Sequence, residues 1–202
     1  MTNELSYLAL GDSYTIGESV AENESWSVQL AQKLTLHSLP TASPRIIAKT
    51  GWTTDELKSK INATRIEQTY DIVSLLIGVN NQYRGRSVEQ FRTEFVDLLE
   101  IAIKFAGNNS SHVFVVSIPD WGVTPFATGR NQNEIATQID LFNAVKKVET
   151  EKRNVLFVDI TPISRQALND KTLIAEDGLH PSGKMYQLWA EKILPDLIKK
   201  LK

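Results

Sequence analysis

The 202-residue chain contains no cysteine, which excludes disulfide bridges, a thiol nucleophile and thiolate metal sites. It also has no excess of one charge: the formal net charge of −2 gives no electrostatic basis for nucleic acid or an anionic membrane as the main partner. No run of about 18 apolar residues is present to span a membrane, and residues 1–4 have no basic or long apolar signal-peptide character. We therefore expect a soluble, cytoplasmic protein without stable membrane insertion.

Several cofactor-binding and catalytic motifs are absent as well. The chain has neither a Gly-x-x-x-x-Gly-Lys-Ser/Thr phosphate loop nor a Gly-x-Gly-x-x-Gly dinucleotide turn. The Gly-x-Ser-x-Gly elbow of α/β-hydrolases is missing too, because Thr15 stands where its final glycine would follow Ser13. The spacing of histidines and carboxylates does not match a metal cluster. The sequence thus predicts no metal and no other cofactor.

Short apolar runs alternate with longer amphipathic stretches along the whole chain. The runs are rich in Ile, Val and Leu with little polar alternation, which is typical of strands buried on both faces of a parallel sheet. They comprise residues 7–10, 45–48, 72–77, 113–118 and 155–160. The helical patterns comprise residues 26–37, 54–66, 88–105, 133–152 and 182–201. This order predicts a three-layer α/β/α sandwich with a five-stranded parallel sheet, formed by a single domain over residues 1–202.

The stretch 88–105 is the clearest of the helical patterns. Its apolar residues recur at spacings of three and four, which places them on one helix face. Ser87 precedes the stretch with Gln90 three residues later, as in a capping box, and Gly107 with Asn108 follows its end. These signals predict both ends of the helix.

In an open parallel sheet, ligands bind beyond the carboxyl ends of the strands, so the segments that follow the strands are the candidates for function. Ser13 follows the first strand, and Gly11 two residues earlier allows a sharp turn that presents the serine at the sheet edge. Taken alone, a serine here is more often a helix cap or a turn residue. Its position still makes it a candidate nucleophile.

Asp177 and His180 form the second candidate element. A separation of three residues on a tight turn lets the carboxylate reach the imidazole Nδ1–H, which fixes the tautomer and leaves Nε2 free as a base. Taken alone, a loop aspartate and a partly buried histidine are the more common interpretation. Of the three histidines, His37 lies in a helical pattern and His112 at a strand start, so His180 is the preferred base. We expect Pro181 to begin the last helix.

An acyl-transfer site also needs donors for the developing oxyanion. Gly51 follows the second predicted strand and Asn80 follows the third, at the same sheet edge as Ser13. The Gly51 N–H and the Asn80 side-chain amide would suit this role. Each signal is weak alone, because Gly and Asn are common in turns.

Taken together, four ordered blocks resemble the SGNH hydrolases, also called GDSL lipases and esterases. The blocks are Gly11-Asp12-Ser13, Gly51, Gly78-Val79-Asn80-Asn81 and Asp177-Gly178-Leu179-His180. The resemblance implies a flavodoxin-like sheet in the order 2-1-3-4-5 and metal-free ester hydrolysis through an acyl-enzyme. It implies Ser13 as nucleophile, His180 as general base and Asp177 as its orienting partner. It also implies an oxyanion hole made by the Ser13 and Gly51 N–H groups and the Asn80 side chain.

The chain departs from the family at Asn81, where the third block usually has aspartate. We expect changed hydrogen bonding in that loop and altered specificity, without loss of activity. The side chains expected to contact substrate follow the relevant strands: Tyr14, Trp52, Asn81, Tyr83 and Trp121. The loop 119–126 is either one wall of the substrate pocket or a hydrophobic loop packed on the sheet. Arg84 and Arg86 either meet an anionic substrate group or are simply solvated.

The resulting hypothesis is a serine esterase that acts on a small-molecule ester, with a short acyl chain or an acetylated small molecule or sugar as substrate. A lysophospholipase or thioesterase with the same machinery is one alternative. The other is a non-catalytic flavodoxin-like binding module in which the triad residues have become structural. The sequence does not indicate an oligomeric state.

Overall fold

Five parallel strands form the centre of the molecule in a computed structural model that describes residues 4–202. They are β1 (Tyr7–Gly11), β2 (Arg45–Ala48), β3 (Ile72–Leu76), β4 (Val113–Val116) and β5 (Leu156–Val158). Their spatial order is β2-β1-β3-β4-β5, and every neighbouring pair is parallel. The predicted order 2-1-3-4-5 is confirmed.

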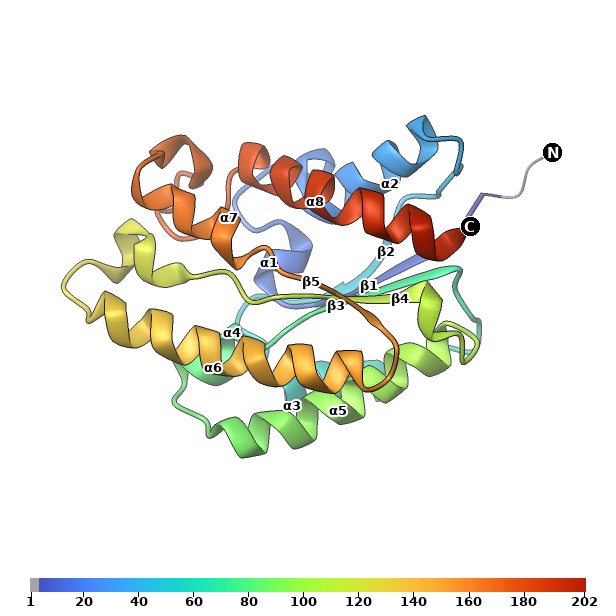
Figure 1. Cartoon of the computed structure of the whole chain (residues 1–202), viewed down its shortest axis with the longest axis horizontal. Helices are drawn as coiled ribbons and strands as arrows, with labels where there is room; N and C mark the ends of the chain where they lie inside the picture. Colours follow the sequence, from blue (N-terminus) through green and yellow to red (C-terminus); the bar gives the residue numbers. More distant parts are fainter. Residues whose placement is uncertain (1–3) are drawn as a thin grey trace.

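Helices cover both faces of this sheet (Figure 1). One face carries α2 (Trp26–Leu36) and α8 (Gly183–Leu201), and the other carries α3 (Thr54–Thr64), α5 (Val88–Phe105) and α6 (Gln132–Glu151). The shorter helices are α1 (Ser13–Ile16), α4 (Val79–Tyr83) and α7 (Thr161–Arg165). Single 3-10 turns lie at η1 (Glu22–Glu24), η2 (Ser110–His112), η3 (Trp121–Val123), η4 (Pro125–Ala127), η5 (Gln166–Leu168) and η6 (Lys171–Leu173). The predicted three-layer α/β/α class is therefore confirmed.

The central strands are buried on both faces, as their unbroken apolar character predicts. Every residue of β1, β3 and β4 is buried, whereas the edge strand β2 is partly exposed. Helix α5 spans the predicted residues 88–105 and buries Phe91, Phe95, Leu98, Leu99 and Ala102. Its N-terminus is capped by the Ser87 hydroxyl, which accepts a hydrogen bond from the Gln90 N–H at 3.1 Å.

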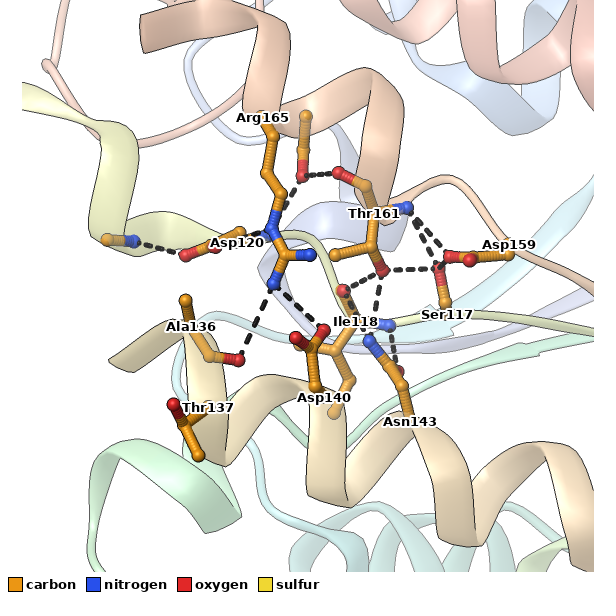
Figure 2. A network of polar contacts seen from close by, with 12 residues as sticks. Ser117, Ile118, Asp120, Ala136, Thr137, Asp140, Asn143, Asp159, Thr161 and Arg165 are labelled. Carbon is orange, nitrogen blue, oxygen red and sulfur yellow. Dashed lines mark hydrogen bonds and ion pairs between the residues drawn. The ribbon is translucent and has the colours of Figure 1, made fainter. Parts of the chain in front are cut away.

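Strands β4 and β5 each end two residues earlier than the sequence predicts, because side chains replace their ladder partners (Figure 2). Beyond the end of β4, the Asn143 amide on α6 accepts from the Ile118 N–H at 2.7 Å and donates to the Ile118 carbonyl at 3.0 Å. Beyond the end of β5, the Ser117 hydroxyl accepts from the N–H groups of Ile160 and Thr161. Because of these bonds, the segments after β4 and β5 leave the sheet at its carboxyl edge.

The last helix begins at Gly183, so the expectation that Pro181 starts it is wrong. Pro181 instead forms an antiparallel bridge with Ile174. Ser182 is the N-cap, and its hydroxyl accepts from the Met185 N–H. Pro181 therefore holds the chain extended between His180 and the helix. Over the described residues, no helix combines the length and the apolar character needed to cross a membrane.

Candidate active site

A cavity of about 130 Å³ opens at the carboxyl edge of the sheet. Four separate parts of the chain line it: the segments after β1, β3 and β4, and the loop that precedes α8. Its lining residues are Ser13, Tyr14, Val79, Asn80, Tyr83, Trp121, Phe126, Leu179 and His180. The fold thus brings the candidate nucleophile, the candidate base and one candidate oxyanion donor into a single cavity.

Ser13 is the first residue of α1, and the tight turn before it has a steric cause. A Cβ on Gly11 would lie 2.1 Å from Thr15 Oγ1 and 2.3 Å from the Leu76 carbonyl, so only glycine fits. Asp12 then caps α1, with its carboxylate accepting from the Tyr14 N–H at 3.1 Å. The Ser13 N–H has no hydrogen-bond acceptor among residues 4–202, as expected at the start of a helix.

Asp177 and His180 are held together by a turn that Asp177 itself organises. One carboxylate oxygen accepts from the N–H groups of Leu179 and His180, both at 2.9 Å. The other accepts from His180 Nδ1 at 2.5 Å and from the Ser19 hydroxyl at 2.8 Å. With Nδ1 donating to Asp177, the Nε2 of the buried His180 ring is free to accept a proton.

The same contacts determine the charge of Asp177. Partial burial alone would raise the pKa of its carboxyl, but the bonds from His180, Leu179 and Ser19 outweigh burial and lower the pKa to about 2. The carboxylate is therefore ionised at neutral pH and can stabilise a charged imidazole. Sequence reasoning missed Ser19, which adopts a left-handed conformation with φ of 65°. Nothing in the sequence around Ser19 marks it as a partner of Asp177, 158 residues away.

The candidate oxyanion donors lie in the loop after β2 and in helix α4, and hydrogen bonds connect these two segments. Asn80, in the first turn of α4, donates through Nδ2 to the Trp52 carbonyl at 3.0 Å. Gly51 has a φ of 82°, which favours glycine, and its carbonyl accepts from the Arg84 guanidinium at 2.6 Å. Asn80 lines the cavity, whereas Gly51 does not. The Gly51 N–H has no acceptor within the described part of the chain.

Asn81, the position that departs from the family pattern, has a structural partner. It is fully buried, and its Oδ1 accepts from the Thr54 N–H at 3.1 Å. Its Nδ2 donates to Thr54 Oγ1 at 2.6 Å and to Glu94 Oε2 at 3.3 Å. Where the family usually has an aspartate, this chain has the Asn81 amide. That amide faces the carboxylate of Glu94. The amide side chain braces α4 against α3 and α5.

The other expected substrate contacts divide into two groups. Tyr14, Tyr83 and Trp121 line the cavity, but Trp52 and Asn81 do not. The two arginines that follow Asn81 are engaged by acids instead of standing free for a ligand. Arg84 contacts Glu56 at 3.4 Å, and Arg86 contacts Asp55 at 2.6 Å and Glu94 at 3.5 Å.

Trp121 and Phe126 of the loop after β4 line the cavity. Figure 2 shows the contacts of Asp120 and Arg165 that anchor this loop. Buried Asp120 accepts from the Gly122 N–H and from Arg165 Nε, both at 2.9 Å. Arg165, at the end of α7, also contacts Asp140 of α6 at 2.8 Å. Trp121, which stands between Asp120 and Gly122 in the sequence, donates through Nε1 to Gln82 Oε1 at 2.8 Å. Sequence reasoning did not find Arg165, because its partners lie in two distant segments.

A buried lysine fixes the two central strands next to the cavity. Lys146 on α6 donates from Nζ to the carbonyls of Ile77 at 3.0 Å and Val116 at 2.8 Å. Burial lowers the pKa of this lysine to about 7, although the charge of Asp12 opposes the shift. Burial likewise raises the pKa of the Asp12 carboxyl to about 7. Lys146 therefore joins the carboxyl ends of β3 and β4, from which the Asn80 and Trp121 segments emerge.

The comparison with protein families identifies the chain as an ester-bond hydrolase of the SGNH class, and the motif segments gather at the carboxyl edge of its sheet. The model of the GDSL-like Lipase/Acylhydrolase family matches residues 9–188, and the chain belongs to that family. Across residues 4–202, no group of three or more His, Asp or Glu side chains is arranged to hold a metal ion.

Solved structures with the same fold include TesA and two proteins described as esterases. TesA has a TM-score of 0.74 at 16% identity, covering 96% of this chain and 99% of its own. The psychrotrophic esterase EstA from Pseudoalteromonas sp., inhibited by monoethylphosphonate, has a TM-score of 0.74 at 17% identity, covering 98% and 99%. Axe2 from Geobacillus stearothermophilus, an acetylxylan esterase, has a TM-score of 0.69 at 19% identity, covering 96% and 94%. No curated protein sequence matches the chain at a significant level.

Proposed function

We propose that this protein is a serine esterase that hydrolyses carboxylic esters with short acyl groups through an acyl-enzyme on Ser13. The observation that carries the proposal is the single cavity lined by Ser13, Asn80 and His180, in which His180 is bonded on its far side to Asp177. A binding module would not need a histidine bonded to a carboxylate in the same cavity as a helix-terminal serine. This arrangement instead provides a nucleophile, a base and an orienting carboxylate.

Each group has one role in the proposed reaction. His180 Nε2 removes the Ser13 hydroxyl proton as Ser13 Oγ attacks the ester carbonyl carbon. The resulting oxyanion accepts hydrogen bonds from the Ser13 and Gly51 N–H groups and from Asn80 Nδ2. His180 then gives its proton to the departing alcohol, which leaves an acyl ester on Ser13. Water, deprotonated by His180, attacks that ester, and His180 returns the proton to the departing Ser13 Oγ as the acid is released. Asp177 stabilises the imidazolium in both halves.

The size and lining of the cavity support a short acyl group. Its volume of about 130 Å³ is below the roughly 150 Å³ of a cavity that holds one benzene molecule. Apolar side chains, including Val79, Trp121 and Leu179, supply most of its wall. The solved relatives that are described as esterases, one of them inhibited by a phosphonate, agree with this chemistry.

A panel of p-nitrophenyl esters from acetyl to dodecanoyl, with an acetylated xylose beside it, tests the proposal. We expect the highest kcat/KM at two to four carbons, and a loss of several orders of magnitude in kcat for Ser13→Ala. A maximum at long chains would favour the lysophospholipase or thioesterase alternative. A folded wild-type protein that hydrolyses none of these esters, or a Ser13→Ala variant of wild-type rate, would contradict the proposal.

A further inference from the structure

Two aromatic residues separate the catalytic cavity from a second hollow. Tyr83 and Trp121 line the 130 Å³ cavity that contains Ser13, and both also line a neighbouring cavity of about 270 Å³. The second cavity is bordered by Gln82, Arg130 and Glu134, among others. The rings of Tyr83 and Trp121 meet edge to face, with their centroids 5.4 Å apart. This pair is therefore a partition one side chain thick.

Arg130 holds this partition from the side of the second cavity. Its guanidinium carbon lies 5.2 Å from the Tyr83 ring centroid, 5.3 Å from that of Trp121 and 5.4 Å from that of Phe126. Its Nη2 also donates to the Tyr83 hydroxyl at 3.2 Å. A planar cation within about 6 Å of a ring face is attracted by the electrons of that ring. One guanidinium thus contacts three aromatic side chains, one from the end of α4 and two from the loop after β4.

The members of the partition differ in how firmly the rest of the fold holds them. Trp121 is 4% exposed and is fixed by Gln82 and by the Asp120–Arg165 anchor. Tyr83 is 46% exposed and Phe126 is 43% exposed. The hydroxyl of Tyr83 has Arg130 as its hydrogen-bond partner, with no other in the described part of the chain. Arg130 therefore contributes more to the positions of Tyr83 and Phe126 than to that of Trp121, although both rings also contact Trp121, with centroid distances of 5.4 Å and 6.0 Å.

We propose that Arg130 is a specificity-determining residue: it keeps Tyr83 and Phe126 closed on Trp121 and so limits the length of the substrate group that enters the catalytic cavity. Without it, Tyr83 can swing outward and the catalytic cavity becomes continuous with the second one. Arg130 does not line the catalytic cavity, so it acts through the aromatic side chains. This inference rests on the proposed esterase activity.

Arg130→Ala tests this role of Arg130, which we call the Arg130 clamp. The measured quantity is the ratio of kcat/KM for p-nitrophenyl octanoate to that for p-nitrophenyl acetate. We expect the ratio to rise at least about tenfold over wild type, since each methylene admitted to an apolar pocket contributes about tenfold or more. Tyr83→Ala should raise the ratio similarly. The Arg130→Ala/Tyr83→Ala double variant should raise it little further, because both changes remove the same Arg130–Tyr83 contact. Arg130→Lys keeps the charge without the planar stacking and should give an intermediate ratio. Arg92→Ala, an exposed arginine on α5, is the matched control.

The results separate failure of this inference from failure of the proposed function. An active wild type whose chain-length ratio is unchanged in Arg130→Ala overturns the Arg130 clamp and leaves the esterase proposal standing. A selective loss of activity on a hemisuccinate ester in Arg130→Ala, with an unchanged chain-length ratio, also overturns it and makes Arg130 an anion-binding residue. A wild type inactive on every ester contradicts the proposed function itself. Circular dichroism of each variant confirms that the fold is retained.

Discussion

Replacing Asn81 by aspartate, the residue that the family usually has there, should destabilise this protein. In the structure the Asn81 amide nitrogen donates to Thr54 Oγ1 and to the Glu94 carboxylate. An aspartate offers only acceptors, so it would lose both bonds and place a second carboxylate against Glu94. The family-typical residue is therefore unfavourable in this chain, where Glu94 already supplies the carboxylate.

The size of the effect follows from the contacts. Losing a hydrogen bond to a charged group costs about 1.5–3 kcal/mol. Two unit charges at the 3.3 Å separation of Asn81 Nδ2 and Glu94 Oε2 would repel by about 5 kcal/mol at an effective dielectric constant near 20, part of which is relieved when the pair shares a proton. We expect a net loss of about 2–4 kcal/mol at pH 7, or a Tm lower by about 4–16 °C for a domain of this size.

Urea unfolding of wild type, Asn81→Asp, Glu94→Gln and the double variant measures this effect. The double variant should recover most of the lost stability, because a glutamine amide at position 94 can donate to the new carboxylate. The deficit of Asn81→Asp should also shrink as the pH falls, since the folded pair holds a proton more tightly than the unfolded chain does. A single variant within 0.5 kcal/mol of wild type, or a double variant no more stable than the single one, would refute this reasoning.

Three further predictions concern the catalytic groups. Asn80→Ala should lower kcat by about 10²–10³ by removing one oxyanion donor; a loss below tenfold in steady-state kinetics would exclude Asn80 from the oxyanion hole. Asp177→Asn should lower kcat by about 10⁴. The lowered pKa of Asp177, about 2, contributes stability that is present above the unfolded pKa near 3.9 and is lost as the pH falls toward 2. Wild type should therefore lose stability more steeply than Asp177→Asn between pH 4 and 2, and parallel acid unfolding curves would contradict this.

The fold was predictable because its signals are local and repeated. Apolar runs of strand length, alternating with amphipathic helices, specify the α/β/α class without any long-range information. Helix α5 illustrates this: the Ser87 cap and the apolar spacing predict both of its ends. The early ends of β4 and β5 were not predictable, because the contacts from Asn143 and Ser117 come from side chains that the sequence does not pair.

The candidate site likewise contains residues that local motifs predict and residues that they do not. Ser13, Asp177 and His180 could be named in advance because each stands in a short motif, and the Asp177–His180 contact spans only three residues. The contributions of Ser19, Glu94 and Arg130 could not, since each acts on a residue from another segment of the chain through an ordinary side chain. Trp52 was expected to contact substrate because it follows Gly51, yet it does not line the cavity, and its carbonyl accepts from Asn80 Nδ2.

The central claim, that Ser13 is a nucleophile activated by His180, is tested most directly by covalent capture with an alkyl fluorophosphonate. Intact mass and peptide mapping should show one adduct per chain, located on Ser13. The rate of adduct formation should fall by several orders of magnitude in a folded His180→Ala variant. A folded wild-type protein that forms no adduct, an adduct on another residue, or an equal rate in His180→Ala would contradict the account.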